Sequence, residues 1–393
     1  MLKFVFSNNI IHRHVFSNNL QRAYFATAAR NFGVSMIAIF EPLYLIKILR
    51  NHGVAHEITL VLLYFGVIFL FYGLLCPLGA RLASRYGLKT VILVSAPFLF
   101  AYYTALLYAS HAPLFIIVAL VVQIINKTLY WPAFHFFFAK SGSDDHRGRE
   151  VSGSLMIGGV AAMIGPPLGG LIISVFGFPA LFATVLLVLT LMAVPFLFIE
   201  EVRPDYHGNL LTEFKNVLSK DSRNNSIAFA ARGIEDTTNG VFWPIFLFLQ
   251  ATSFFAIGLI MFAATAVILT ATFLIGHISD KVDKRLILRG GVIITSLVWF
   301  SRMFIKTPFQ ALTTNLFYGF GITTVAVPFA SIFYGAVAKE GQNPYHAVIV
   351  REVARNLSIT VFMVICALIL PLIPNIGVLF PAVSLITLFI SKI

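Results

Sequence analysis

Runs of about 20 mainly apolar residues, separated by short polar loops, recur along the whole chain. A helix rises about 1.5 Å per residue, so about 20 residues cross the roughly 30 Å hydrocarbon core of a bilayer. We count twelve such runs, near residues 24–47, 57–80, 88–110, 112–138, 151–175, 178–199, 226–249, 253–277, 286–305, 308–337, 346–370 and 373–391. This pattern predicts an all-α membrane protein with about 12 transmembrane helices.

Composition supports a membrane protein and argues against other classes. Hydrophobic residues make up 59% of the chain and charged residues 11%, whereas soluble domains carry about 25% charged residues. The net charge of +12 does not indicate nucleic-acid binding, because the basic residues lie in short loops and form no basic arm. Cys76 and Cys366 lie in apolar stretches without metal or redox spacing, so we expect no metal or cofactor.

Positive charge alternates between loops. Lys and Arg are frequent in the loops that hold residues 81–89, 140–149, 203–223 and 281–289, and rare in the intervening loops. Loops on the cytoplasmic side of a membrane carry an excess of Lys and Arg. We therefore expect a multi-pass protein of the inner (plasma) membrane with both termini in the cytoplasm.

The longest polar segment divides the chain in two. We predict a cytoplasmic N-terminal segment over residues 1–23, a six-helix bundle over 24–199, a linker over 200–225 and a second bundle over 226–393. The linker contains an amphipathic pattern over 209–221, which indicates either a helix at the inner membrane surface or a solvated connection.

The two bundles share a weak internal repeat. Ala-Ala-Arg precedes a proline by twelve residues in both halves, from Arg30 to Pro42 and from Arg232 to Pro244. The same offset of 202 relates Arg149-Glu150-Val151 to Arg351-Glu352-Val353. Repeats of this kind predict two related six-helix bundles in parallel orientation.

Two loops resemble the cytoplasmic signature of the major facilitator superfamily. GARLASRYGLK at 79–89 follows the second span, and GHISDKVDKR at 276–285 follows the eighth. The resemblance assigns a gating role to Gly79, Arg85, Gly87, Lys89, Gly276, Asp280, Lys281, Lys284 and Arg285. Ser84 replaces the usual aspartate of the first loop and Asp283 the usual glycine of the second. We therefore expect a weaker charge latch in the first half.

The fifth span contains GPPLGG, in which Gly165, Pro166, Gly169 and Gly170 are similar to the signature of antiporters in this superfamily. Its small residues and proline permit close, kinked helix contacts. The resemblance implies two six-helix domains around a cavity that opens alternately to each side. It also implies a binding site lined by spans 1, 4, 7 and 10.

Several ionisable residues fall inside these spans. They include Glu41 in span 1, Lys127 in span 4, and Glu235 and Asp236 in span 7. Charges inside a membrane are costly and mark functional sites. We expect one carboxylate of span 7, and secondarily Glu41, to carry a proton.

Polar residues of spans 4 and 10 complete the candidate pathway. Gln123, Lys127, Tyr130 and Trp131 share one helical face, which we place on the cavity. Asn315 and Tyr318 are candidate wall residues.

Other buried charges have a structural interpretation. Arg302 lies at a helix end and is expected to extend its charge to the headgroups. We expect Arg30, Arg232, Arg351, Glu352 and Arg355 either to tie helices together or to extend their charges to the headgroups.

The chain is therefore identified as a member of the major facilitator superfamily, working by alternating access. We expect proton-coupled efflux of small organic or amphipathic compounds, with protons and lipids as partners, in a monomer. Alternatives are a proton symporter or uniporter for a sugar or carboxylate, a channel, and a membrane scaffold or lipid scramblase. An enzyme is not expected, because the sequence has no His-Glu-x-x-His, Gly-x-Ser-x-Gly or phosphate-loop motif.

Overall fold

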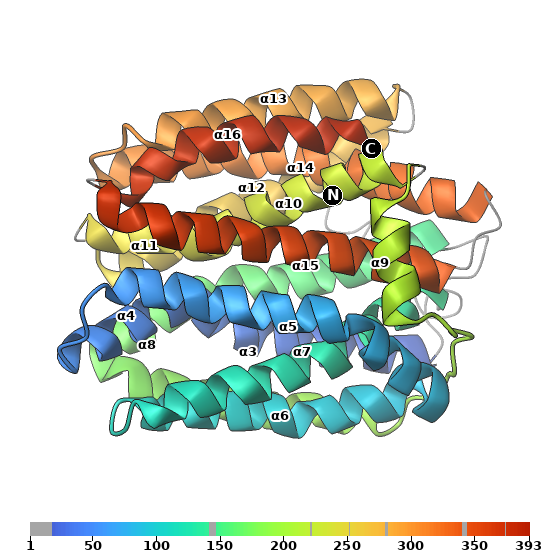
Figure 1. Cartoon of the computed structure of the whole chain (residues 1–393), viewed down its shortest axis with the longest axis horizontal. Coiled ribbons are helices and arrows are strands. Elements are labelled where there is room, and N and C mark those ends of the chain that lie inside the picture. Colours follow the sequence, from blue (N-terminus) through green and yellow to red (C-terminus); the bar gives the residue numbers. More distant parts are fainter. Residues whose placement is uncertain are drawn as a thin grey trace, which may run out of the picture.

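The computed structural model describes residues 18–140, 147–220, 222–250, 252–279, 282–339, 344–373 and 375–393. Its helices run side by side along one axis (Figure 1). In the first half they are α3 (Asn18–Ala38), α4 (Glu41–Asn51), α5 (Glu57–Tyr86), α6 (Leu88–Ala109), α7 (Leu114–Lys140) and α8 (Arg147–Phe196). The short helix α9 (Leu210–Leu218) follows. In the second half they are α10 (Arg223–Thr237), the π-helix η1 (Thr238–Phe242), α11 (Trp243–Leu249), α12 (Phe254–Ser279), α13 (Lys284–Arg302), α14 (Pro308–Lys339) and α15 (Pro344–Ile369), followed by the 3₁₀ turns η2 (Leu370–Leu372) and η3 (Ile376–Leu379), α16 (Phe380–Leu388) and η4 (Phe389–Lys392).

Within the described residues these elements form twelve successive passes, and the predicted all-α membrane fold is confirmed. α3 and α4 make one pass, and α10, η1 and α11 make another. α8 contains two passes separated at Gly177, whose φ of 83° and ψ of 176° are not helical. Glycine tolerates this backbone conformation because it lacks a Cβ atom.

The repeated prolines each follow an irregular segment of helix. α3 ends in a turn just before Pro42, and the π-helix η1 lies just before Pro244. Proline lacks an N–H group and its ring clashes with the carbonyl four residues earlier, so a regular helix cannot pass through it undisturbed. The sequence repeat therefore corresponds to a local irregularity of the helix in each half, a turn in the first and a π-helical segment in the second.

Eight helices of the described chain are long and apolar enough to cross a membrane by length and composition. The first pass of the second half contains Arg232, Glu235 and Asp236, and α13 contains basic residues in its first turns. Those passes are less apolar than the others because they carry buried or interfacial charge.

Helices of the two halves meet along two seams. α5 contacts α15, and α8 contacts α12; in Figure 1 the first-half helices lie below and the second-half helices above. The glycines of the fifth span form part of this packing. A Cβ atom on Gly165 or Gly169 would overlap Ser35 or Met36 of α3, and one on Gly170 would overlap Phe254 of α12. The glycine motif thus packs one helix against both its own half and the other.

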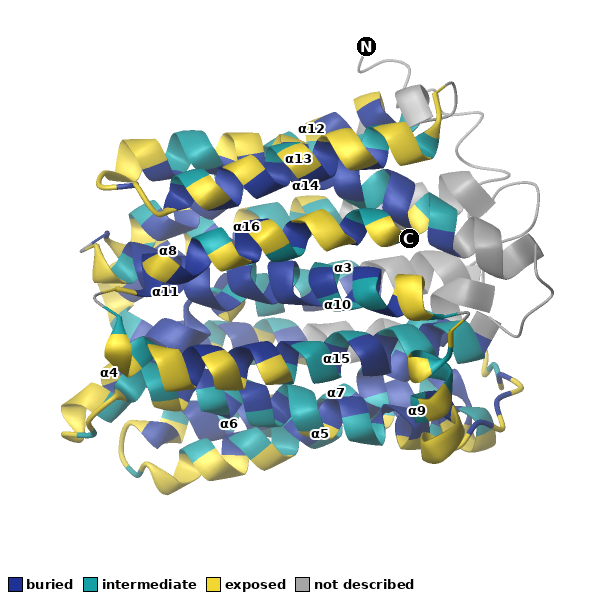
Figure 2. Ribbon diagram, turned by 45° about the horizontal axis from the view of Figure 1, so that its top comes forward, coloured by how far each residue is buried: buried dark blue, intermediate teal, exposed yellow. Residues whose placement is uncertain are grey.

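The outer surface is apolar. Figure 2 shows exposed residues along the outer sides of α12, α13 and α16. Among the large apolar side chains exposed on these helices are Leu259, Ile293, Leu297 and Leu385. Such a surface is unsuited to water and fits contact with lipid.

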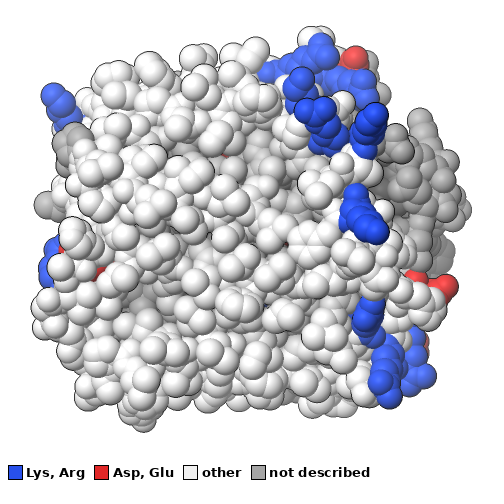
Figure 3. Space-filling view, viewed as in Figure 1, with Lys and Arg blue, Asp and Glu red and all other residues white. Residues whose placement is uncertain are grey.

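Charged side chains gather at one end of the helices. Figure 3 shows most visible Lys and Arg side chains at the end where Figure 1 places α9, and few at the opposite end. We call the former the basic end. The positive charge predicted for alternate loops therefore lies together in space.

The linker packs against both halves at the basic end. Glu213 of α9 is fully buried, and its carboxylate accepts a hydrogen bond of 3.0 Å from Tyr206 Oη and lies 2.6 Å from His346 Nδ1 of α15. Burial and the nearby Glu213 carboxylate raise the pKa of Tyr206, so this hydroxyl remains a donor. Ser84, which replaces the expected aspartate, donates to Pro204 O at 2.6 Å. The segment thus holds a helix, α9, which contacts α5 and α15; its place at the inner membrane surface stays a prediction.

We expect Glu213→Ala to lower the free energy of unfolding by about 1–3 kcal/mol, because buried donors lose their acceptor. The measurement is thermal or denaturant unfolding of purified protein in detergent. Asp205→Ala is the matched control, because the Asp205–His207 pair is 85% and 89% exposed and exposed pairs contribute little. Equal stability of the two variants would contradict a structural role for Glu213.

Candidate transport cavity

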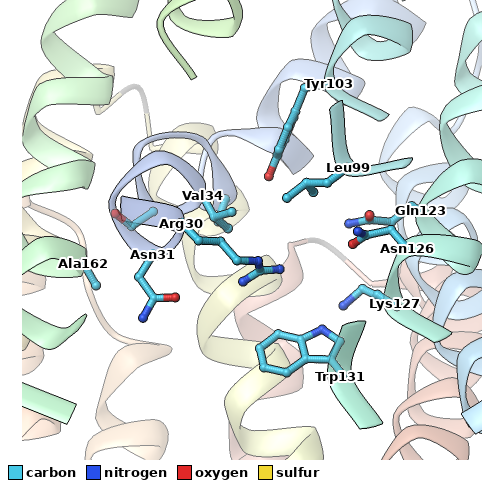
Figure 4. Close-up of a pocket in the computed structure, with 12 residues that line it drawn as sticks. Arg30, Asn31, Val34, Leu99, Tyr103, Gln123, Asn126, Lys127, Trp131 and Ala162 are labelled. Carbon is cyan, nitrogen blue, oxygen red and sulfur yellow. The ribbon is translucent and has the colours of Figure 1, made fainter. Parts of the chain in front are cut away.

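A cavity of about 550 Å³ lies between the two halves. Residues of α3 to α7 line it from the first half, and residues of α10, η1, α14 and α15 line it from the second. A second cavity of about 320 Å³ adjoins it near α3, α6 and α7. Figure 4 shows side chains of the smaller cavity pointing into one space. The volumes lie within the roughly 300–1,000 Å³ of small-molecule sites.

α7 presents a polar stripe to these cavities. Gln123, Lys127 and Trp131 line both, and His135 lines the larger one. Their spacing of four residues places them on one helical face. Tyr130, which we expected on the same wall, lines neither cavity; it is buried with Arg30 Cζ 3.8 Å from its ring centroid.

The two carboxylates of α10 face different surroundings. Asp236 lines the larger cavity and lies 2.9 Å from Arg232 Nη2 and 3.5 Å from Arg355 Nη2 of α15. Glu235 is fully buried behind the wall, where it lies 2.6 Å from Arg232 Nη1. Adjacent residues of a helix point about 100° apart, so only Asp236 reaches the cavity.

Asn315 and Tyr318 of α14 do not line the described cavities, which corrects their assignment as wall residues. Tyr318 Oη donates to Glu235 Oε1 at 2.8 Å. Asn315 accepts a hydrogen bond of 2.7 Å from Arg302 and donates one of 2.7 Å to Ile260 O. The rotation of α14 turns both side chains into the packing of the second half, where they bind buried charges.

Arg302 is also placed differently from our expectation that it reaches the headgroups. Arg302 is fully buried. Its Cζ lies 4.1 Å, 4.2 Å and 4.5 Å from the ring centroids of Trp243, Trp299 and Tyr318. Aromatic faces attract a guanidinium, and Arg stacks on them better than Lys. The cation therefore joins three helices inside the second half.

We expect Arg302→Ala to lower the free energy of unfolding by about 3 kcal/mol, because hydrogen bonds to charged groups contribute about 1.5–3 kcal/mol and desolvated cation–π contacts about 2 kcal/mol. Arg302→Lys should recover little of this loss. Unfolding of the purified variants in detergent provides the measurement. The control is Arg50→Ala, which removes the ion pair between Glu57 and an Arg50 side chain that is 56% exposed, and it should change stability little. A loss of stability equal to that of Arg302→Ala would contradict the buried role of Arg302.

Glu352 of α15 is a cavity residue that we expected only to tie helices together. Its carboxylate lies 3.0 Å from Arg351 Nη2 and 3.6 Å from His135 Nε2 of α7. It also accepts a hydrogen bond of 3.0 Å from Tyr72 Oη of α5. One carboxylate thus contacts both halves. His135 was absent from our sequence-based candidates, although extending the stripe Gln123, Lys127, Trp131 by four residues reaches it.

Glu41 lines the larger cavity at the first residue of α4. It is buried and accepts a hydrogen bond from Tyr102 Oη. Among the described residues it makes no ion pair. Its proposed share in a proton pathway stays a prediction.

The first signature loop forms a turn that binds the linker. Gly87 has φ of 97°, which favours glycine. The N–H groups of Lys89 and Thr90 donate to Glu201 at 2.9 Å and 3.0 Å. Arg85 lies over the ring of Tyr86 at 5.3 Å. A Cβ atom on Gly79 would overlap Thr128 O of α7, so this glycine sets the spacing of α5 and α7.

The second signature loop is described in part. Asp280 and Lys281 lie outside the described residues. Asp283, where glycine is usual, caps α13 by accepting from Arg285 N at 2.9 Å. Lys284 Nζ donates to Ser331 Oγ of α14 at 2.7 Å, and a Cβ atom on Gly276 would meet open space. The predicted charge latch stays a prediction.

Known proteins resemble this chain in sequence and in fold. A "Multi-drug resistance efflux pump PmrA homolog" of Lactococcus lactis subsp. lactis (strain IL1403) is 24% identical over 325 residues, covering 78% of this chain and 77% of that protein. The crystal structure of a D-xylose-proton symporter superposes with a TM-score of 0.67 at 14% identity, covering 94% of this chain and 96% of that one. The crystal structure of the human organic anion transporter MFSD10 (TETRAN) superposes with a TM-score of 0.68 at 14% identity, covering 95% of this chain and 99% of that one. At this identity the two structures show the fold alone.

A family model also matches most of the chain. The family described as the Major Facilitator Superfamily matches residues 23–349, which is most of the chain and includes parts of both halves. The chain therefore belongs to the major facilitator superfamily and is a multi-pass secondary transporter of small molecules, not an enzyme.

Proposed function

We propose that this transporter exports small organic or amphipathic compounds in exchange for protons. Its basic end faces the cytoplasm, in accord with the positive-inside rule. The efflux pump homologue from Lactococcus lactis supports export. The glycine motif that packs α8 against α3 and α12 resembles the antiporter signature and supports exchange.

The observation that carries proton coupling is the position of Asp236. Its carboxylate lines the cavity, and two arginines from different helices lie at 2.9 Å and 3.5 Å from its oxygens. Protonation removes the negative charge and weakens both contacts. The proton thereby changes the charge of the cavity wall and the contact between α10 and α15. A carboxylate that binds the two arginines when ionised and releases them when protonated can link proton movement to substrate movement.

Glu352 offers a route from protonation to conformational change. It contacts Arg351 on its own helix and Tyr72 and His135 across the interface. Hydrogen bonds to a charged group contribute about 1.5–3 kcal/mol, and allosteric coupling typically amounts to about 1–3 kcal/mol. The free energy lost when this one carboxylate is neutralised is therefore large enough to favour a state in which the two halves are separated. In this scheme residues 24–199 and 226–393 move as two bodies of a monomer.

The test is a proteoliposome assay with an internal pH-sensitive dye. A pH gradient is imposed, and cationic, anionic and neutral aromatic compounds are added in turn. Proton flux triggered by a compound, seen with wild type and absent with the Glu235→Gln, Asp236→Asn double variant, supports coupling. Its direction distinguishes antiport from symport. Substrate counterflow without any proton flux would contradict the proposed coupling.

A further inference from the structure

The smaller cavity has an unusual charge composition for a buried site. Arg30 and Lys127 both line it, and no Asp or Glu of the described chain does. Figure 4 shows the two cationic side chains reaching from α3 and α7 toward one space beside Trp131. Its other walls combine apolar groups with amides. This composition leaves positive charge without a balancing group in the wall.

The arginines of the larger cavity, which Lys127 also lines, differ from these two cations. Arg232 and Arg355 both contact Asp236, and Arg351 contacts Glu352. Each arginine there therefore has a carboxylate partner close by. The wall charge of the larger cavity is largely neutralised within the protein.

Arg30 and Lys127 make no ion pair within the described residues. Arg30 is 5% exposed, and its Nε has no hydrogen-bond partner. Lys127 Nζ lies 5.1 Å from the ring centroid of Phe69. The buried Gln123 Oε1 is also without a partner. Glu41 of the adjoining larger cavity acts on Lys127 from beyond ion-pair distance. A buried charge without a close partner is unfavourable, so the site suits a group that supplies one.

We propose that the smaller cavity binds the acidic group of organic anions that carry a flat apolar body. The acidic group lies between Arg30 and Lys127, whose donors suit carboxylate, sulfonate or phosphate oxygens. The body packs against Trp131, Leu99 and Tyr103, which line the same cavity. This inference rests on the proposed transport function and names its substrate class.

Organic cations fit the described cavities less well. The carboxylates that line these cavities are Glu41, Asp236 and Glu352, and all three lie in the larger cavity. Asp236 and Glu352 are held by arginines, and Glu41 accepts from Tyr102. A cation would have to compete with these contacts, whereas an anion meets two cations that form no ion pair within the described residues.

The test measures binding to purified protein in detergent, without any pH gradient. The probes are naphthalene-2-sulfonate, its neutral isostere naphthalene-2-sulfonamide, and (2-naphthylmethyl)trimethylammonium, which carry an anionic, a neutral and a cationic head group on one aromatic body. Equilibrium dialysis gives each dissociation constant for wild type, Lys127→Gln, Arg30→Gln and Lys127→Arg. Lys47→Gln is the matched control, because Lys47 is an exposed lysine that does not line the cavities.

We expect wild type to bind the sulfonate about tenfold or more tightly than the sulfonamide, a difference in the range of charge-assisted recognition. Lys127→Gln and Arg30→Gln should remove this preference while sulfonamide binding persists, and Lys127→Arg and Lys47→Gln should retain it. Equal binding of sulfonate and sulfonamide to wild type, preference for the ammonium probe, or a preference unchanged in both Gln variants would overturn the proposal. Because no proton gradient is present, these results are independent of whether transport is coupled to protons.

If a Gln variant does not fold, the salt dependence of wild-type binding gives a second readout. Sulfonate binding should weaken as sodium sulfate is added, because sulfate competes for the same cations, while sulfonamide binding stays unchanged. Equal effects of sulfate on both probes would also overturn the proposal.

Discussion

Asp236→Asn is expected to abolish proton-driven transport while leaving substrate exchange intact. The amide cannot gain or lose a proton, yet it has nearly the shape of the carboxylate that lines the cavity between Arg232 and Arg355. Transport driven by a pH gradient should fall by about 100-fold or more, near the upper end of the range that coupling free energies of about 1–3 kcal/mol cover. Counterflow of labelled substrate, which needs no net proton movement, should continue.

The matched control for Asp236→Asn is Glu57→Gln. Glu57 also pairs with an arginine, Arg50 at 2.6 Å, but it lies at the end of α5 and outside the cavities. This variant should retain proton-driven transport. If Asp236→Asn retained it as well, Asp236 would not be the coupling carboxylate, and Glu352→Gln would become the next variant to measure.

Gly169→Leu is expected to prevent assembly of a transport-competent protein. Even a Cβ atom on Gly169 would overlap the carbonyl oxygen of Met36 in α3, and backbone atoms of two packed helices cannot move aside as a flexible side chain can. Overpacking typically costs about 1–3 kcal/mol for added methylenes, and a leucine against a backbone exceeds that range. Close helix contact in membranes depends on such small residues.

Gly290→Leu is the control for this substitution. Gly290 is an exposed helical glycine of α13, and a Cβ atom there meets nothing within 4 Å. We expect Gly290→Leu to give monodisperse protein in size-exclusion chromatography with normal counterflow, and Gly169→Leu to give aggregate or no protein. Normal counterflow by Gly169→Leu would contradict the close α3–α8 contact.

Local patterns predicted much of this architecture. The apolar runs are long enough to span a bilayer, so their number and order follow from length and hydropathy alone. The matched prolines Pro42 and Pro244 predicted corresponding passes, and Pro42 follows a turn while Pro244 follows the π-helix η1. The four-residue spacing of Gln123, Lys127 and Trp131 placed them on one face, and the structure shows that face at the cavities.

Tertiary rotation and long-range pairing could not be predicted in the same way. Arg302 lies near a helix end, yet its aromatic partners come from α11, α13 and α14, so its burial depends on how three helices pack. Asn315 and Tyr318 share a helix with wall residues, but the rotation of α14 directs them toward Arg302 and Glu235. Glu352 acquires its partners Tyr72 and His135 from the other half, which no spacing within one helix reveals.

The most direct test of obligatory exchange is proton movement driven by substrate alone. Proteoliposomes are loaded with naphthalene-2-sulfonate at the same pH on both sides, diluted into substrate-free buffer, and followed with an internal pH-sensitive dye while the membrane potential is clamped. The account predicts that outward substrate movement drives protons inward, with acidification of the lumen that Asp236→Asn abolishes. Alkalinisation of the lumen would show symport, and substrate efflux with no change of pH would show uncoupled transport; either result would contradict proton antiport.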